Sequence, residues 1–118
     1  MKTASDLIAE SKTRIREVSA ADTAKALKGP TPPIILDVRE PVETNLGRVA
    51  GATVIPRGTL ETKVEAMIPR EATVVIYCAS GNRSAFAADT LQQMGYKNVA
   101  SLAGGWMAWK AIDGPVEG

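Results

Sequence analysis

The sequence contains no histidine and only one cysteine, Cys78, among its 118 residues. A zinc site built from cysteine and histidine is therefore excluded, as are Cys–His and Ser–His nucleophile pairs. One cysteine cannot form an internal disulfide, and a lone free thiol favours a reducing compartment. We therefore expect a cytoplasmic protein that uses neither a metal nor a cofactor.

Long apolar runs and an excess of one charge are also lacking. No stretch approaches the ~20 apolar residues of a membrane span, and charged residues follow Met1–Asp6 where a signal peptide would be apolar. Fourteen lysines and arginines balance thirteen acidic residues, for a net charge of +1. This balance gives no reason to expect binding to nucleic acid or a membrane. We expect one small domain, with a monomer as the default state.

Hydrophobic runs and turn signals alternate along the chain. Strands are predicted at 34–38, 53–55, 73–77 and 98–102, with a short edge strand near 16–18. Helices are predicted from Thr3, over 19–28, 58–67 and 84–94, and after Gly104. This order predicts an α/β fold, in which a mostly parallel sheet carries helices on both faces. Residues 1–15 are expected to form a helical extension and residues 16–118 the domain.

The single cysteine occupies the position where such sheets bind ligands. Cys78 directly follows the strand over 73–77 and precedes the helix expected from Ser84, and ligands gather at the carboxyl ends of parallel strands. Gly81 permits a positive φ, and Asn82 tolerates the left-handed region too. A tight loop of this kind turns successive N–H groups inward as an anion-binding nest, and Arg83 adds a permanent positive charge.

A thiol in this cradle should be acidic and reactive. Helix N-termini and nearby cations lower the pKa of cysteine below ~8.5, and a thiolate needs no histidine as a base. A lone cysteine at a strand end is often only a small buried hydrophobe, but Gly81 and Arg83 favour the reactive interpretation. That interpretation requires the sulfur to be reachable from solvent. Ser80 and Ser84 lack a base and are not expected to be nucleophiles, although Ser84 can cap the helix.

Four segments, in order, resemble single-domain members of the rhodanese family of sulfurtransferases. The most specific is Cys78-Ala79-Ser80-Gly81-Asn82-Arg83-Ser84, which fits the family's Cys-x-x-Gly-x-Arg-Ser active loop. The others are Asp37-Val38-Arg39-Glu40, the Gly51-Ala52 and Ile55-Pro56 pairs, and Leu102-Ala103-Gly104-Gly105-Trp106 with Trp109. The resemblance extends from about residue 16 to residue 116.

The resemblance implies the rhodanese fold, with a five-stranded sheet and helices on both faces. It also implies that Cys78 attacks a small anionic sulfur donor such as thiosulfate and becomes a persulfide. Cyanide or a thiol, on a small molecule or on a protein, then removes the outer sulfur. The amides from Ala79 to Arg83 would cradle the persulfide, and Arg83 would hold the loop. Because there is no second cysteine, the acceptor must come from outside the chain.

Other charged residues are weaker candidates for the site. Arg39 and Arg57 follow predicted strand ends, and Arg48 stands where many members of the family carry histidine. These three arginines can form an anion-attracting rim, or they can be ordinary surface charges worth under ~1 kcal/mol each. Asp37 is expected to be structural, by accepting hydrogen bonds or by pairing with an arginine. Core packing is expected for at least one of Trp106 and Trp109.

Two alternatives to a sulfurtransferase enzyme remain open. One is a persulfide carrier that delivers sulfur to a partner protein. The other, less favoured, is a phosphatase of the same broad fold. Such phosphatases place five residues between cysteine and arginine, whereas this chain has the four residues from Ala79 to Asn82. The shorter ring suits a sulfur atom better than a phosphoryl group.

Overall fold

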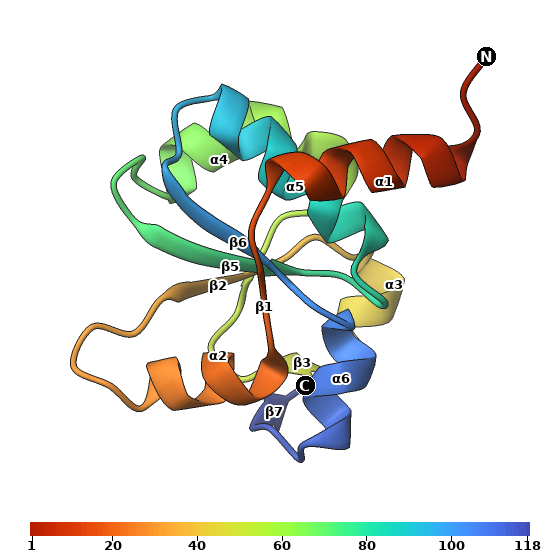
Figure 1. Ribbon diagram of the computed structural model, residues 1–118. Coiled ribbons are helices and arrows are strands. Elements are labelled where there is room, and N and C mark those ends of the chain that lie inside the picture. The colour runs from red at the N-terminus through yellow and green to blue at the C-terminus, as the bar shows by residue number, and fades with distance from the viewer.

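A parallel sheet of five strands forms the centre of the computed structural model, which describes all 118 residues (Figure 1). The strand order is β1 (Glu17–Val18), β6 (Asn98–Leu102), β5 (Thr73–Tyr77), β2 (Ile34–Asp37) and β4 (Thr53–Val54). Every neighbouring pair in this sheet is parallel. The structure thus confirms the predicted α/β fold. Because β5 is the middle strand, the loop that follows it lies at the centre of one sheet edge.

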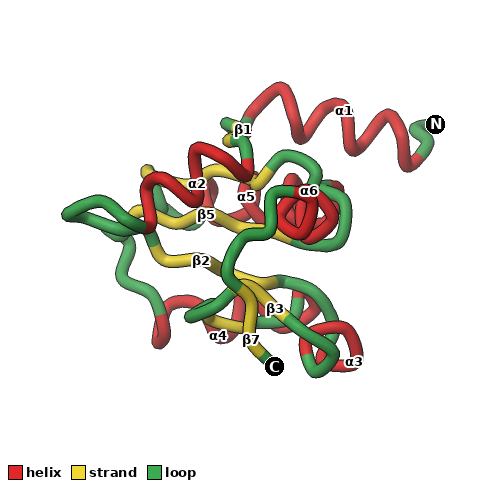
Figure 2. Tube along the Cα trace, turned by 90° about the horizontal axis from the view of Figure 1, so that it is seen from below, coloured by secondary structure: helices red, strands yellow, loops and turns green.

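Helices cover the two faces of the sheet in separate layers. α1 (Ala4–Arg14), α4 (Leu60–Met67) and α5 (Asn82–Gln93) lie on one face, and α2 (Ala20–Leu27) and α6 (Gly105–Ala111) on the other (Figure 1). Figure 2, which views the molecule from below, shows α1 running outward from the β1 edge toward a projecting N-terminus. No helix is both long enough and apolar enough to cross a membrane.

Side chains of β5 alternate between two hydrophobic clusters, as expected for a strand buried on both faces. Val74 and Ile76 face the cluster beneath α4 and α5, and the Cys78 side chain belongs to the same cluster. Tyr77 faces the other cluster, which contains the fully buried Trp109 of α6. Burial of Trp109 confirms the expectation that at least one tryptophan packs in the core. This alternation aims Cys78 toward the start of α5.

The helix starts follow the capping patterns of the sequence. Thr3 and Asp6 form a reciprocal capping box at the start of α1, and the Ser19 side chain caps α2. α1 is fastened to α5 because Arg14 donates hydrogen bonds to both carboxylate oxygens of Asp89.

Three short elements were not predicted, because a few residues show no periodicity. They are α3 (Pro41–Thr44) and an antiparallel pair of β3 (Arg48–Val49) with β7 (Val116–Glu117). The helix predicted over 58–67 is a 3₁₀ turn, η1 (Arg57–Thr59), followed directly by α4. Among these, α3 matters most for the site, since it lies beside the start of α5 (Figure 1).

Candidate active site

The loop from Cys78 to Gly81 joins β5 to α5 in a sharp turn. Gly81 adopts φ +108° and is the N-cap of α5, so the loop depends on the conformational freedom of glycine at this position. The helix begins at Asn82, two residues earlier than predicted, because Asn82 is helical and only Gly81 enters the left-handed region. Ser84 therefore lies inside the first turn and is not the cap.

The sulfur of Cys78 is surrounded by hydrogen-bond donors from this turn. The backbone N–H of Gly81 donates to Sγ at 3.1 Å, and that of Ser84 donates at 3.4 Å. The Ser84 hydroxyl oxygen lies 3.5 Å from the same sulfur. Unpaired N–H groups at a helix start stabilise negative charge, so this arrangement favours a thiolate over a thiol.

The first turn of α6 holds the loop in shape from outside. The N–H of Trp106 donates to the Cys78 carbonyl at 2.7 Å, and the N–H of Met107 donates to the Ala79 carbonyl at 3.3 Å. Gly105 makes this approach possible, because a Cβ at that position would lie 2.3 Å from the Cys78 carbonyl oxygen. In a planar peptide the N–H points away from the C=O. Fixing both carbonyls outward therefore turns the N–H groups of Ala79 and Ser80 toward the inside of the loop.

Burial and hydrogen bonding act on the Cys78 thiol in opposite directions. Burial raises its pKa, but hydrogen bonds from the Ser84 hydroxyl and from the N–H groups of Ser84, Gly81 and Ser80 outweigh that effect, so the pKa lies below the usual value. The residue is only 1% exposed. The sulfur thus lies beneath its loop rather than on an open surface, so the solvent access that a reactive thiol requires is not seen in this structure.

A second buried hydroxyl extends the hydrogen-bond chain from the sulfur. The Ser101 hydroxyl of β6 lies 2.8 Å from the Ser84 hydroxyl, and both residues are fully buried. When Ser84 donates to a thiolate, its oxygen is free to accept from Ser101, so the two hydroxyls can reinforce each other. Sequence reasoning missed Ser101. The available signal was a polar residue within a buried strand, at the position paired with Ile76 of β5.

Asp37 and Arg39 form a buried ion pair next to the site. The Arg39 guanidinium donates to both carboxylate oxygens of Asp37, at 2.9 to 3.2 Å, and to the Gly47 carbonyl at 2.7 Å. The Tyr77 hydroxyl donates to Asp37. Burial is the main cause that raises the pKa of Tyr77, and this hydrogen bond is the second. Asp37 accordingly has the structural contacts that were expected of it.

Arg39 does not occupy the exposed position expected of a rim residue. It is 3% exposed, and its guanidinium lies 4.7 Å from the ring centroid of Trp106. Asp37 is the last residue of the buried strand β2, so the arginine that pairs with it is drawn beneath the surface. An arginine held in this way attracts no anion from solvent.

The other two rim candidates are also paired with carboxylates. Arg57 donates to Glu61 at 2.9 Å and to the Thr90 hydroxyl at 3.2 Å. Arg48 lies 3.9 Å from a carboxylate oxygen of Glu117. The three arginines therefore do not form an unpaired cationic rim.

Arg83, the only basic residue between Cys78 and Ser84, lies in the first turn of α5 and is paired as well. Its guanidinium donates to both carboxylate oxygens of Glu43 in α3, at 2.8 and 3.0 Å. The backbone N–H of Glu40 donates to the same carboxylate at 3.1 Å. The Arg83 hydrogen bonds are the main cause that lowers the pKa of Glu43 to about 2. No local pattern indicated this pair, since α3 was not predicted.

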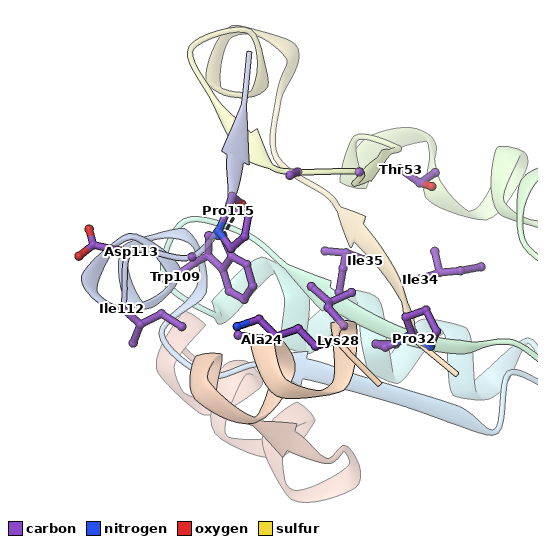
Figure 3. A pocket seen from close by; sticks show the side chains of 15 residues that line it. Ala24, Lys28, Pro32, Ile34, Ile35, Thr53, Trp109, Ile112, Asp113 and Pro115 are labelled. Atoms are coloured by element: carbon purple, nitrogen blue, oxygen red, sulfur yellow. Dashed lines mark hydrogen bonds between the residues drawn. The ribbon is translucent and has the colours of Figure 1, made fainter. Parts of the chain in front are cut away.

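A large hollow of the molecule lies away from Cys78. Its volume is about 760 Å³, and it is bounded by the end of α2, the start of β2 and residues 109–115 (Figure 3). Ile34 and Ile35 place it near the beginning of β2, whereas Cys78 follows the end of β5. The polar N–H of Trp109 is already used, since it donates to the Pro115 carbonyl at 2.9 Å. Lys28 and Asp113 also line this hollow, which lies toward the opposite end of the strands from Cys78.

Comparison with known proteins defines the class to which this fold and loop belong. The model of the rhodanese-like domain matches residues 19–112. A sulfurtransferase of Allochromatium vinosum is 33% identical over 95 residues, covering 80% of this chain and 88% of that protein. The thiosulfate sulfurtransferase GlpE of Tolumonas auensis is 32% identical over 78 residues, covering 66% and 73%. In some longer relatives, the match spans 19% of their length.

A solved structure extends the likeness over almost the whole chain. A Rhodopseudomonas palustris protein of unknown function, described as a possible tyrosine phosphatase, is 34% identical with a TM-score of 0.89. The match covers 99% of this chain and 96% of that one. The chain belongs to the rhodanese family, as its loop and sheet indicated. The family and its sulfurtransferase relatives support a sulfurtransferase activity.

Proposed function

We propose that the protein transfers sulfane sulfur from a small anionic donor such as thiosulfate, with Cys78 as the nucleophile. The observation that carries this proposal is the set of donors directed at one sulfur atom, the N–H groups of Gly81 and Ser84. The Cys78 thiolate attacks the outer sulfur of thiosulfate. A new S–S bond forms, the bond between the two sulfur atoms of thiosulfate breaks, and sulfite leaves with its electron pair.

The persulfide is discharged in a second step. A nucleophilic acceptor attacks the outer sulfur of Cys78, and the original thiolate is released. With cyanide the product is thiocyanate, and with a thiol the product is a new persulfide. No other cysteine exists in the chain, so an internal disulfide cannot form and the acceptor comes from outside.

The loop supports both steps with fixed dipoles. Negative charge is present on the thiolate, on the persulfide and on both transition states, and it lies at the start of the twelve-residue helix α5. Backbone N–H groups held by α6 need no rearrangement as charge moves by one S–S bond length. Preorganised donors of this kind usually account for a large part of a rate enhancement.

A phosphatase activity is less well supported, although one structural relative is described as a possible tyrosine phosphatase. Only four residues separate Cys78 from Arg83, and Arg83 is bound to Glu43 instead of being free to hold a phosphoryl group. Because of these two features, we expect no hydrolysis of p-nitrophenyl phosphate.

A persulfide carrier uses the same first step as the enzyme and differs only in its acceptor.

Mass spectrometry after incubation with thiosulfate tests the first step. We expect the protein to gain the mass of one sulfur atom at Cys78, and cyanide to remove it as thiocyanate. Cys78→Ser should abolish both the adduct and thiocyanate formation. Sulfur transfer to cyanide at a multiple-turnover rate would support an enzyme, and a single slow turnover would support a carrier.

Labelling with iodoacetamide tests whether the buried sulfur can be reached. We expect the folded protein to be alkylated at Cys78 near neutral pH, because hydrogen bonds keep a fraction of the thiol ionised. A thiol that stays unmodified until the protein is unfolded, together with the absence of a thiosulfate adduct, would overturn the proposed function.

A further inference from the structure

We infer that Glu43 is a positioning residue that binds Arg83 and thereby makes the active site discriminate against doubly charged sulfur donors. The inference rests on the proposed function, and it adds a determinant of donor choice that lies outside the Cys78 loop. Its basis is the arrangement of charge beside the sulfur, where each arginine that could attract an anion already has an acidic partner.

The Glu43–Arg83 pair has a fixed geometry. Two parallel hydrogen bonds of 2.8 and 3.0 Å join the guanidinium to the carboxylate, which is the strongest way for these groups to meet. The carboxylate is held from its other side by the Glu40 N–H. Glu43 is thus locked at the third residue of α3, and Arg83 is turned toward α3.

This pairing removes the charge advantage that Arg83 would give to an incoming anion. Arg83 is the only basic side chain between Cys78 and Ser84, and Arg39, Arg48 and Arg57 have carboxylate partners of their own. An anion near Arg83 meets the guanidinium and the Glu43 carboxylate together. Attraction and repulsion therefore nearly cancel, and the energetic gain falls short of that from a free arginine.

The penalty grows with the charge of the donor. Thiosulfate carries two negative charges, so Glu43 repels it more strongly than it repels a singly charged organic persulfide, and a neutral donor is unaffected. The side chains of Arg83 and Glu43 are 37% and 31% exposed, so the pair is accessible to a competing anion. We therefore expect organic persulfides to be better donors than thiosulfate for the wild-type protein.

Glu43→Gln tests the inference with probes that need no sulfur transfer. Glutamine keeps an oxygen that can accept the Glu40 N–H, but it has no charge. Alkylation rates of Cys78 are compared for iodoacetate, which is anionic, and iodoacetamide, which is neutral. Their ratio at one pH is independent of the thiolate fraction. We expect the iodoacetate-to-iodoacetamide ratio to rise about tenfold in Glu43→Gln at low salt and to fall back as salt is added.

Two further variants show whether the effect belongs to this pair. Glu65→Gln removes an equal charge from a carboxylate that pairs with Arg70, near the far end of α5, and should leave the ratio unchanged. In the double variant Glu43→Gln with Arg83→Gln, the rise should disappear, because no unpaired guanidinium remains. An unchanged ratio in folded Glu43→Gln, or an equal rise in Glu65→Gln, overturns the inference.

Turnover then connects the pair to donor choice. With thiosulfate and cyanide, Glu43→Gln should lower the KM for thiosulfate about tenfold with little change in kcat. The gain with cysteine persulfide, which carries a single net negative charge, should be smaller. If the alkylation ratio rises but no variant forms thiocyanate, the proposed function fails and the charge effect stands. If wild type turns over but the ratio and KM do not move, the role of Glu43 fails alone.

Discussion

Two arginine–carboxylate pairs lie near Cys78, and they join the same chemical groups in different surroundings. Arg39 donates to both carboxylate oxygens of Asp37 through Nε and Nη2, and Arg83 donates to both of Glu43 through Nη1 and Nη2, at 2.8 to 3.2 Å. The Arg39 and Asp37 side chains are 3% and 0% exposed, whereas roughly a third of the Arg83 and Glu43 side-chain surfaces is in contact with solvent. Both pairs join a guanidinium to a carboxylate, and they differ in how far their side chains are exposed to water.

Burial decides what each pair can do. Arg39 is fixed on several sides, by Asp37, by the Gly47 carbonyl and by the rings of Tyr77 and Trp106, so separating the pair would leave a buried charge uncompensated. Water already solvates part of Arg83 and Glu43, so their pairing adds little to the stability of the fold. The buried pair therefore serves the structure, and the exposed pair sets the charge that an incoming anion meets in the role inferred above.

The largest expected effect comes from breaking the buried pair. Asp37→Asn should lower the free energy of unfolding by about 3 kcal/mol or more, because Arg39 then stays buried without a counter-charge. Urea denaturation followed by circular dichroism measures this loss. Glu43→Gln is the matched comparison, since it makes the same chemical change in the exposed pair. Equal losses in the two variants would mean that burial does not distinguish the pairs.

A second variant tests how much the Ser101 hydroxyl contributes to the low pKa of Cys78. Ser101→Ala removes the hydroxyl that supports Ser84, and we expect the pKa of Cys78 to rise, because the Ser84 hydroxyl then binds the thiolate without a supporting donor. The pH dependence of thiolate absorbance measures it. Ser11→Ala changes another buried serine, on α1, and should leave this pKa unmoved. An unshifted pKa in Ser101→Ala would limit Ser101 to packing.

The smallest effect is the contribution of the exposed pair to stability. Glu43 has its usual pKa of 4.5 when unfolded and a pKa of about 2 when folded, so the pair stabilises the fold above pH 4.5, and this stabilisation is lost as the pH falls toward 2. Because the pair is solvent-exposed, we expect wild type to exceed Glu43→Gln by less than about 1 kcal/mol at neutral pH. Urea titrations at successive pH values should show that gap closing below pH 4.5. A gap that widens in acid would contradict this sign.

Much of the fold was predictable because the long helices and strands have recognisable apolar patterns and capping residues in the sequence. The apolar run over 73–77 matches β5 residue for residue, and the capping residues Thr3 and Ser19 mark the starts of α1 and α2. α3 was missed because four residues starting at Pro41 resemble a turn. Its position beside α5 depends on contacts between residues about forty positions apart, which no local pattern records.

The residues of the candidate site likewise divide into those that a local pattern indicated and those that only the fold brings together. Cys78, Gly81 and Arg83 were singled out because a strand, a glycine and a basic helix start are consecutive in the sequence. The roles of Glu43 and Ser101, and the burial of Arg39, depend on which strands and helices become neighbours. The start of α5 was misplaced by two residues because Ser84 resembles a cap, whereas its hydroxyl bonds to Ser101.

The bonds between the first turn of α6 and the carbonyls of Cys78 and Ala79 have a consequence for engineering. The shape of the seven residues from Cys78 to Ser84 depends in part on α6, a helix that begins more than twenty positions downstream and binds two of their carbonyls. A designer who transplants this motif onto another parallel sheet must bring the Gly104–Gly105 corner with it. Any Cβ at position 105 would collide with the backbone of Cys78 and Ala79, and would distort the loop even when no substrate is bound.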